Sequence, residues 1–155
     1  LEILRPTLGD AHDHVAYAKM AYGSLLRRRG DLERARDLLR QAAAVFAASP
    51  DNPQSPIADA ELGGTLVDLG QTSAAIPLLE AALARPAHGA FGPLSRATAR
   101  LALARALWIR TSERERAREL VAAAQHELAN AELHGRQDEA RRELSIELDA
   151  WRAEH

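Results

Sequence analysis

Two histidine-containing stretches carry the residue types of metal sites. His126-Glu127 opens the pattern of a zinc-protease helix, in which a second histidine follows four residues after the first, but this chain has Asn130 there, a poor zinc ligand. His134 lies two turns beyond His126, too far along a helix axis to share a metal readily. His12-Asp13-His14 also has metal-ligating side chains, yet these residues are explained by a repeat linker in which Asp13 or His14 starts the next helix. We therefore predict no metal and no cofactor.

The run Arg27-Arg28-Arg29 is the strongest local cationic feature. Acidic residues follow at Asp31 and Glu33, no aromatic side chains are interleaved, and the formal net charge of the chain is -2. The sequence also has no cysteine, no glycine-rich phosphate loop, no nucleophile elbow and no pair of catalytic carboxylates. We predict that the chain is not an enzyme and does not bind nucleic acid.

The composition points to one all-α domain. The chain has 155 residues, 46% of them hydrophobic and only 4% aromatic, and Ala and Leu, which lose little on entering a helix, dominate the apolar set. No run of about 18 apolar residues is present, so we predict no membrane partner. The absence of cysteine permits a reducing compartment, and we expect a cytoplasmic protein. Lys19 is the only lysine among many arginines, which suggests a bacterial source.

The elements that would position any site are helices. Glycine, proline and polar clusters separate seven segments in which apolar residues recur three and four apart. We expect Ser112 and Glu115 to form a capping box and Gly135 to end the sixth segment. The predicted helices are Val15 to Arg29, Leu32 to Ala48, Pro56 to Leu69, Ser73 to Ala84, Leu94 to Arg110, Glu113 to Leu133 and Gln137 to Ala153.

The first four predicted helices are two copies of one hairpin. Gly30 and Gly70 are 40 residues apart, and the same spacing relates the pairs Gly23 and Gly63, Ala35 and Ala75, and Leu39 and Leu79. A third copy follows, because Leu103-Ala104 lies 41 residues beyond Leu62-Gly63, with one extra residue expected in the turn at Thr111. Repeats of this length bury their apolar faces by stacking on one another.

These residues resemble the tetratricopeptide repeat, in which Leu-Gly in the first helix is coupled to Ala, three residues and a large apolar group in the second. Leu62-Gly63 with Ala75 and Leu79 fits this signature, and Tyr22-Gly23 with Ala35 and Leu39 nearly does. The resemblance implies a right-handed α-solenoid of about three helix-turn-helix repeats with a C-terminal capping helix. We expect residues 1–9 to be the tail of a preceding repeat helix and a linker, residues 10–135 the three hairpins, and residues 136–155 the cap.

Two narrower resemblances refine this expectation. The segment from Leu8 to Ala16 is similar to the link between kinesin-light-chain-like repeats, and the stretches around Trp108 and Trp151 resemble the final repeats of large bacterial Ser/Thr protein kinases. With Leu1-Glu2-Ile3-Leu4 read as the end of an earlier helix, the chain looks like a fragment of a larger signalling protein.

In such arrays the first helix of each hairpin lines the concave surface, so the resemblance implies a groove for a protein or peptide partner. Kinesin-light-chain-like groove asparagines and the Lys/Asn carboxylate clamp of chaperone-cofactor repeats are both missing. Met20, Leu101 and Trp108 have an alternative role as packing residues. The alternative function is a structural or self-associating array, joined through its open N-terminal repeat, that positions an upstream kinase or transcription-regulator domain. The candidate groove residues are Tyr17, Met20, Ser24, Arg27, Ile57, Glu61, Gly64, Asp68, Leu101, Arg105 and Trp108.

Overall fold

The computed structural model describes residues 13–49 and 51–155, which form an all-α solenoid without strands in the described part. The expected tail of a preceding helix at residues 1–9, and His12 of the possible metal-ligating stretch, lie outside the described residues. None of the described helices is long and apolar enough to cross a membrane. The helices are α2 Asp13–Arg28, α3 Leu32–Ala47, α4 Ser55–Asp68, α5 Thr72–Ala84, α6 Pro93–Trp108, the 3-10 turn η1 Thr111–Glu113, α7 Arg114–Ala129 and α8 Arg136–Glu154.

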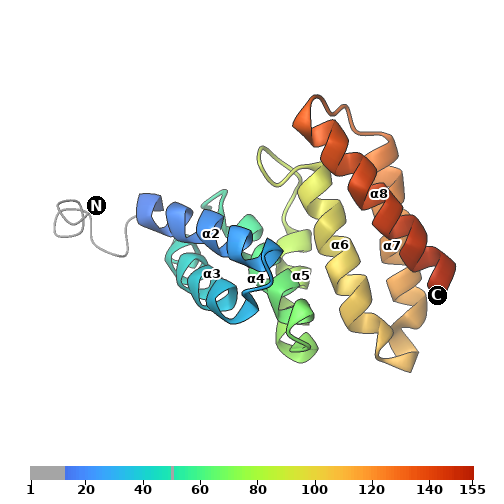
Figure 1. Ribbon diagram of the computed structural model, residues 1–155, viewed down its shortest axis with the longest axis horizontal. Coiled ribbons are helices and arrows are strands. Elements are labelled where there is room, and N and C mark those ends of the chain that lie inside the picture. Colours follow the sequence, from blue (N-terminus) through green and yellow to red (C-terminus); the bar gives the residue numbers. More distant parts are fainter. Residues whose placement is uncertain (1–12, 50) are drawn as a thin grey trace.

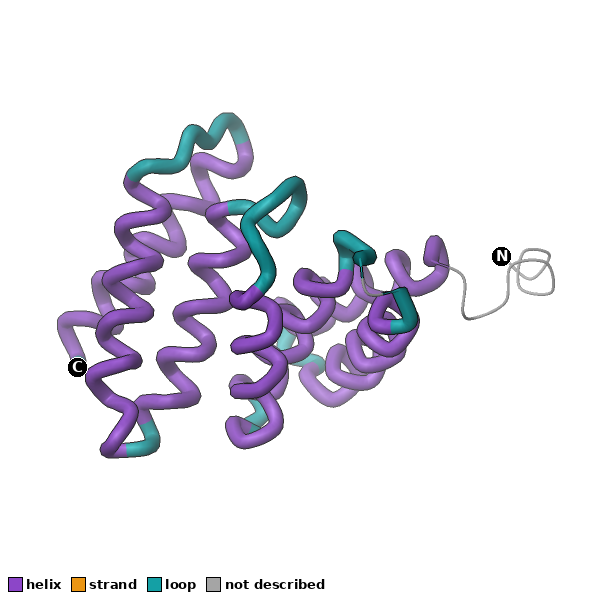
Figure 2. Tube along the Cα trace, turned by 180° about the vertical axis from the view of Figure 1, so that it is seen from behind, coloured by secondary structure: helices purple, strands orange, loops and turns teal. Residues whose placement is uncertain are grey.

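Three helical hairpins stack in chain order, as Figures 1 and 2 show. α2 pairs with α3, α4 with α5 and α6 with α7, and α4 contacts both neighbouring first helices, α2 and α6. α8 contacts α7 and α6 in the same way that α6 contacts α5 and α4. α8 therefore occupies the position that the first helix of a fourth hairpin would take.

Small residues allow the two helices of each hairpin to approach closely. A Cβ added at Gly23 would lie 2.8 Å from Cγ of Leu39, and one added at Gly63 would lie 2.7 Å from Cγ of Leu79. Both leucines are completely buried, so neither side chain has free space to move into. The repeated glycines thus mark the places where the two helices of each hairpin approach closely, and the third hairpin has the fully buried Ala104 at the equivalent place.

The turns inside the hairpins differ in the way the sequence predicts. Gly30 and Gly70 have φ values of 85° and 74°, and the amides that follow them, Asp31 N–H and Gln71 N–H, donate back to Leu26 and Leu66 carbonyls. This is the left-handed helix ending that glycine adopts at low cost. The third hairpin has Thr111 instead of glycine, and there the chain makes the 3-10 turn η1 before α7 begins.

Most predicted helix boundaries lie within two residues of the observed ones, but three expectations at helix ends are wrong. α7 ends at Ala129 instead of Leu133, and Gly135, with φ 61°, precedes α8 instead of closing α7. Ser112 lies within η1, so the expected capping box with Glu115 does not start α7. The residues after Asn130 form a short loop because they contain no apolar stripe long enough to extend α7.

One hydrophobic core runs through all the hairpins and is closed by α8. Leu144, Leu148 and Trp151 are the buried residues of α8, and they belong to the same cluster as the cores of the three hairpins. Trp151 contacts Trp108 of α6 edge to face, with ring centroids 5.3 Å apart. This apolar stripe, spaced four and three residues apart, holds α8 on the end of the array.

A partly buried ion cluster fixes α6 between its neighbours. Arg96 and Arg100 of α6 both pair with Glu127 of α7, and the three side chains are 12%, 18% and 22% exposed. Arg96 also donates to the backbone oxygens of Arg85 (2.7 Å) and Leu83 (3.4 Å), at the end of α5. Burial, and then the nearby Arg96 charge, lower the pKa of Arg100. Arg96 thus joins α6 to the end of α5 and to α7.

Candidate binding groove

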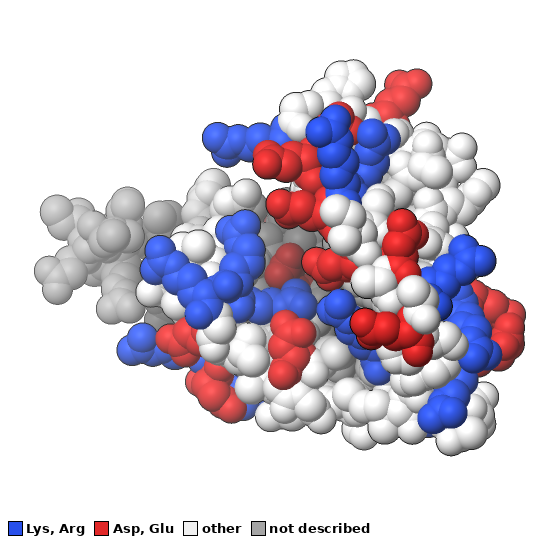
Figure 3. Space-filling view, turned by 45° about the vertical axis from the view of Figure 1, so that its right-hand side comes forward, with Lys and Arg blue, Asp and Glu red and all other residues white. Residues whose placement is uncertain are grey.

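A cavity of about 590 Å³ opens between the first helices of the hairpins and α8. Four elements surround it: α2, α4, α6 and α8. In Figure 3 basic and acidic side chains gather around a recess in this face of the molecule. The cavity is lined by Ser24, Arg27, Arg28, Glu61, Asp68, Leu94, Thr98, Leu101, Ala102, Arg105, Ala140, Glu143, Leu144 and Glu147.

Six of the eleven candidate residues predicted from the sequence line this cavity. They come from three different helices, and their common feature is the position facing the inner surface of the array. Two more candidates line a smaller cavity of about 200 Å³ that shares Arg27 and Glu61 with the first. The six are Ser24, Arg27, Glu61, Asp68, Leu101 and Arg105, and the two are Ile57 and Gly64.

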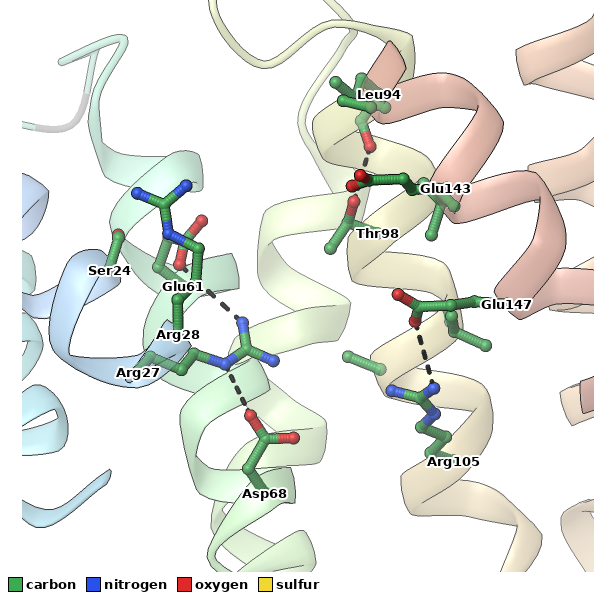
Figure 4. A pocket seen from close by; sticks show the side chains of 14 residues that line it. Ser24, Arg27, Arg28, Glu61, Asp68, Leu94, Thr98, Arg105, Glu143 and Glu147 are labelled. Carbon is green, nitrogen blue, oxygen red and sulfur yellow. Dashed lines mark hydrogen bonds and ion pairs between the residues drawn. The ribbon is translucent and has the colours of Figure 1, made fainter. Parts of the chain in front are cut away.

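Arg27 connects α2 to α4 within one wall of the groove. Its Nε donates to a carboxylate oxygen of Asp68 at 2.7 Å, and its Nη1 lies 3.8 Å from a carboxylate oxygen of Glu61. The guanidinium lies over Gly64, where an added Cβ would be 2.6 Å from Nη1. Figure 4 shows this arginine extended along the wall that α4 forms. Arg27 is therefore satisfied within the chain and fixes one wall of the groove.

Arg105 makes the corresponding connection on the opposite wall. Its Nη2 lies 3.3 Å from a carboxylate oxygen of Glu147, so α6 is joined to α8. Both side chains are about half exposed, at 43% and 55%, and the pair is accessible to solvent and to a partner. Figure 4 places this pair across the cavity from Arg27, with Thr98 and Glu143 on the same side.

Trp108 stands at one end of the groove, in a group of three rings. Its ring lies edge to face against Trp151 and against His155, whose centroid is 4.6 Å away, and the guanidiniums of Arg114 and Arg118 lie 5.0 and 5.2 Å from it. A second cavity, of about 400 Å³, lies beside these rings and shares Arg105 and Glu147 with the main one. Trp108 therefore both packs against α8 and lines this second cavity.

Two of the predicted groove residues, Tyr17 and Met20, line none of these cavities, and a third, Leu101, is almost completely buried. Tyr17 is 55% exposed on α2 but lines neither the main cavity nor the two that adjoin it. Met20 is 6% exposed and packs in the core. Leu101 is 2% exposed, so it forms the floor of the groove and offers a partner little surface.

The sequence reasoning missed the wall that α8 supplies. Glu143, Leu144 and Glu147 line the main cavity, and Glu147, Trp151 and Glu154 line the second one. The resemblance assigned residues 136–155 only a capping role. The signal that was available is the spacing of Glu143, Glu147 and Glu154, which puts three carboxylates on one face of a helix, beside its apolar stripe.

Within residues 13–49 and 51–155, the side chains that could ligate a metal do not assemble into a cluster. Among the described residues no group of three His, Cys, Asp or Glu side chains is placed to hold a metal ion. His126 is exposed, and Asn130 donates to its backbone oxygen at 2.8 Å. His14 is exposed at the beginning of α2.

The fold and the groove define this protein as an all-α solenoid of stacked helical hairpins whose first helices form a concave face. Residues 14–88, which hold the hairpins from α2 to α5, match the family model described as tetratricopeptide repeat, and this match supports the predicted resemblance. The hairpin of α6 and α7 continues the same arrangement. Such repeats generally mediate protein–protein interaction, and domains built from them are typically scaffolds without catalysis. No curated protein and no solved structure matches the chain.

Proposed function

We propose that this chain is a protein-binding module and that a peptide or protein segment binds in the groove between α2, α4, α6 and α8. The single observation that carries the proposal is the main cavity, in which six residues predicted from three separate repeats meet. Its volume of about 590 Å³ falls in the range of roughly 300–1,000 Å³ usual for ligand sites. The family match to tetratricopeptide repeats supports the same class of function.

The groove has the composition of a protein-interaction surface. Leu94, Leu101, Ala102 and Leu144 provide an apolar floor, charged side chains form the two walls, and Trp108 lies at one end. Tryptophan and arginine are the side chains that most often dominate binding energy at interfaces. A partner would therefore gain affinity from the floor and from Trp108, and orientation from the charged walls.

The test is a substitution that places a large side chain in the groove and leaves the ion pairs of Arg27 and Arg105 intact. Thr98 is exposed and lines both the main and the smaller cavity, and its hydroxyl bonds only within its own helix. Peptides of 12 random residues displayed on phage are selected on the immobilised chain, and the dissociation constants of the enriched peptides are measured by fluorescence anisotropy. Thr98→Trp is expected to weaken binding at least about tenfold by occupying the site.

A matched control separates blocking from general disturbance. Ala44→Trp places the same large ring at an exposed position of α3 and is expected to leave the affinity unchanged. Enriched peptides that bind Thr98→Trp as tightly as the parent chain would show that the groove is not the site. A selection that enriches no peptide at all would count against the whole proposal.

A second candidate function is favoured by the outer face of α2. Positions 58, 62 and 65 of α4 and their equivalents 99, 103 and 106 of α6 are all 5% exposed or less, because the preceding hairpin covers them. The matching positions of α2 hold Ala18, Tyr22 and Leu25, of which the first two are exposed, Tyr22 at 52%, and the third is half-buried. α2 thus presents an inter-repeat face of apolar residues to solvent.

We infer from this face an array function, in which the second helix of a further hairpin packs on α2. That hairpin belongs either to upstream repeats of the same polypeptide or to a second copy, and the array would then position an upstream kinase or transcription-regulator domain. The test is sedimentation of the chain with and without Tyr22→Lys, together with its stability when upstream repeats are attached. A chain that stays monomeric at about 100 µM, and whose stability upstream repeats do not change, would argue against this role.

A further inference from the structure

The binding groove is longer than its main cavity. The main cavity and the cavity beside the tryptophans adjoin at the Arg105–Glu147 ion pair, which lines both of them. The two cavities therefore lie end to end along α6 and α8, and we call them together the trough. Its floor is apolar along the first part, at Leu101 and Leu144, and aromatic at the end, at Trp108 and Trp151. A partner segment that follows α8 would contact both parts.

The charges along this trough are unequal. Five carboxylates line the two cavities against three guanidiniums, and the ion pairs of Arg27 and Arg105 use three of these carboxylates. Two carboxylates, Glu143 and Glu154, are left against the one guanidinium of Arg28. Glu143 and Glu154 form no ion pair within the described residues. The wall that α8 provides is therefore acidic, and these two exposed carboxylates have charge available for a partner.

The spacing of the acidic wall suits an extended row of cations. Glu143, Glu147 and Glu154 follow at intervals of four and seven residues on α8, so their Cα atoms are about 6 and 10 Å apart along the helix axis. The last of them, Glu154, lines the cavity beside the tryptophan rings, so a lysine or arginine of a partner that pairs with it would also lie next to an aromatic surface. Arg114 and Arg118 of the chain already lie against the ring of Trp108, so the carboxylate is the main attraction there. Figure 4 shows Glu143 and Glu147 projecting from α8 toward the cavity.

We infer that the occupant of the groove is a basic segment of a protein partner, with at least two Arg or Lys side chains facing α8 and an apolar side chain on the floor. The inference rests on the proposed groove function and names the chemistry of the ligand. The acidic wall also disfavours an acidic segment, because carboxylates brought against Glu143 and Glu154 would meet like charge in a partly desolvated site.

The peptides selected on the parent chain supply the first test. We expect the enriched sequences to carry a net positive charge, and we expect binding to weaken as the salt concentration rises. Selection on Glu143→Lys/Glu154→Lys is expected to enrich acidic sequences instead. Neutral or acidic peptides on the parent chain that lose affinity on Thr98→Trp would overturn the basic-segment inference while leaving the groove function in place.

The second test measures the wall directly. Each exposed ion pair contributes roughly two- to fivefold in affinity, so Glu143→Gln/Glu154→Gln is expected to weaken the enriched peptides about five- to tenfold. Glu119→Gln/Glu132→Gln removes the same charge from exposed positions outside the trough and is expected to change the affinity less than twofold, about the limit of such a measurement. An equal loss of affinity in the two double variants would show that the effect comes from the net charge of the chain, and the proposal would then be wrong.

Circular dichroism of each variant confirms that the helices are intact. If the chain itself associates and Glu143→Gln/Glu154→Gln abolishes that association, the occupant is a second copy and the proposal of a separate partner is wrong.

Discussion

The guanidinium of Arg27 occupies the space that a side chain at position 64 would fill. A Cβ built on Gly64 would lie 2.6 to 2.8 Å from three atoms of that guanidinium, although the two residues belong to different repeats. The same arginine pairs with Asp68 and Glu61, one turn on either side of the glycine along α4. Gly64 therefore serves the contact between α2 and α4, and its role in the groove is indirect.

This relationship predicts coupling between the two positions. Replacing glycine by alanine inside a helix normally stabilises by about 0.5–1 kcal/mol. In the parent chain we expect Gly64→Ala to bring no gain, because the new methyl displaces Arg27 from its carboxylates. In an Arg27→Ala background the same change is expected to recover the full gain. Urea unfolding of the four chains measures the coupling, and equal effects of Gly64→Ala in both backgrounds would contradict it.

The close approach at Gly63 makes a different prediction. Its added Cβ would meet Cγ of Leu79 at 2.7 Å, and Leu79 is completely buried. Unlike the flexible end of an arginine, this side chain cannot move aside, so Gly63→Ala is expected to destabilise by about 1–2 kcal/mol despite the better helix propensity. Thermal unfolding checks this. Addition of Leu79→Ala is expected to cost less in the Gly63→Ala chain than in the parent, and additive losses would rule out the steric explanation.

The cluster of Glu127 with two arginines predicts a large effect of a small change. Glu127→Gln keeps the size of the side chain but leaves Arg96 and Arg100 without their carboxylate, so we expect a loss of about 1–3 kcal/mol. Glu115→Gln is the control, since Glu115 is 76% exposed in its pair with Arg118 and its loss should cost less than about 1 kcal/mol. Urea midpoints compare the two, and similar losses would mean that burial of the cluster contributes nothing.

Asp59 predicts a dependence of stability on pH. Burial raises the pKa of its carboxyl above the ordinary value of 3.8, and the charge of Arg85 partly opposes this shift. The folded chain then binds the proton more tightly than the unfolded chain, so the contribution of Asp59 to stability falls as pH rises from 3.8 through the folded pKa. Asp59→Asn cannot ionise. We expect it to raise Tm by about 1–2 °C at neutral pH and by nothing near pH 3, which is below the ordinary pKa.

Thermal unfolding of parent and variant across this pH range is the measurement. A difference in Tm that stays constant with pH would show that desolvation of the charge is not the cause. A variant less stable than the parent at neutral pH would show that attraction to Arg85 outweighs burial.

The fold could be predicted because its determinants are local and repeated. The two helices of a hairpin approach closely where Gly23 meets Leu39 and Gly63 meets Leu79, and both pairs recur in the sequence at the repeat spacing. The left-handed turns are marked in the same way by Gly30 and Gly70. Gly135 was misinterpreted because the same positive φ suits the residue after a helix and the residue before one. Which of the two applies depends on whether the preceding helix reaches it, and α7 ends earlier.

The groove could be predicted only in part, because it depends on how helices far apart in the sequence meet. Positions facing inward on α2, α4 and α6 follow from the repeat, and six of them line one cavity. Arg27 forms an ion pair with Asp68, which is 41 residues away in the sequence, and no local sequence pattern predicts this contact. The same holds for α8, whose acidic face becomes a wall only because Trp151 packs on Trp108.

α8 has two roles that cannot be separated. It seals the hydrophobic end of the solenoid with Leu148 and Trp151, and on its neighbouring face it provides the acidic side of the trough. If the proposed partner binds that face, its binding also holds α8 on the end of the core, so we expect occupancy to stabilise the array against unfolding from its C-terminal end. Detachment of α8 would remove one wall of the proposed site and expose the end of the core at the same time.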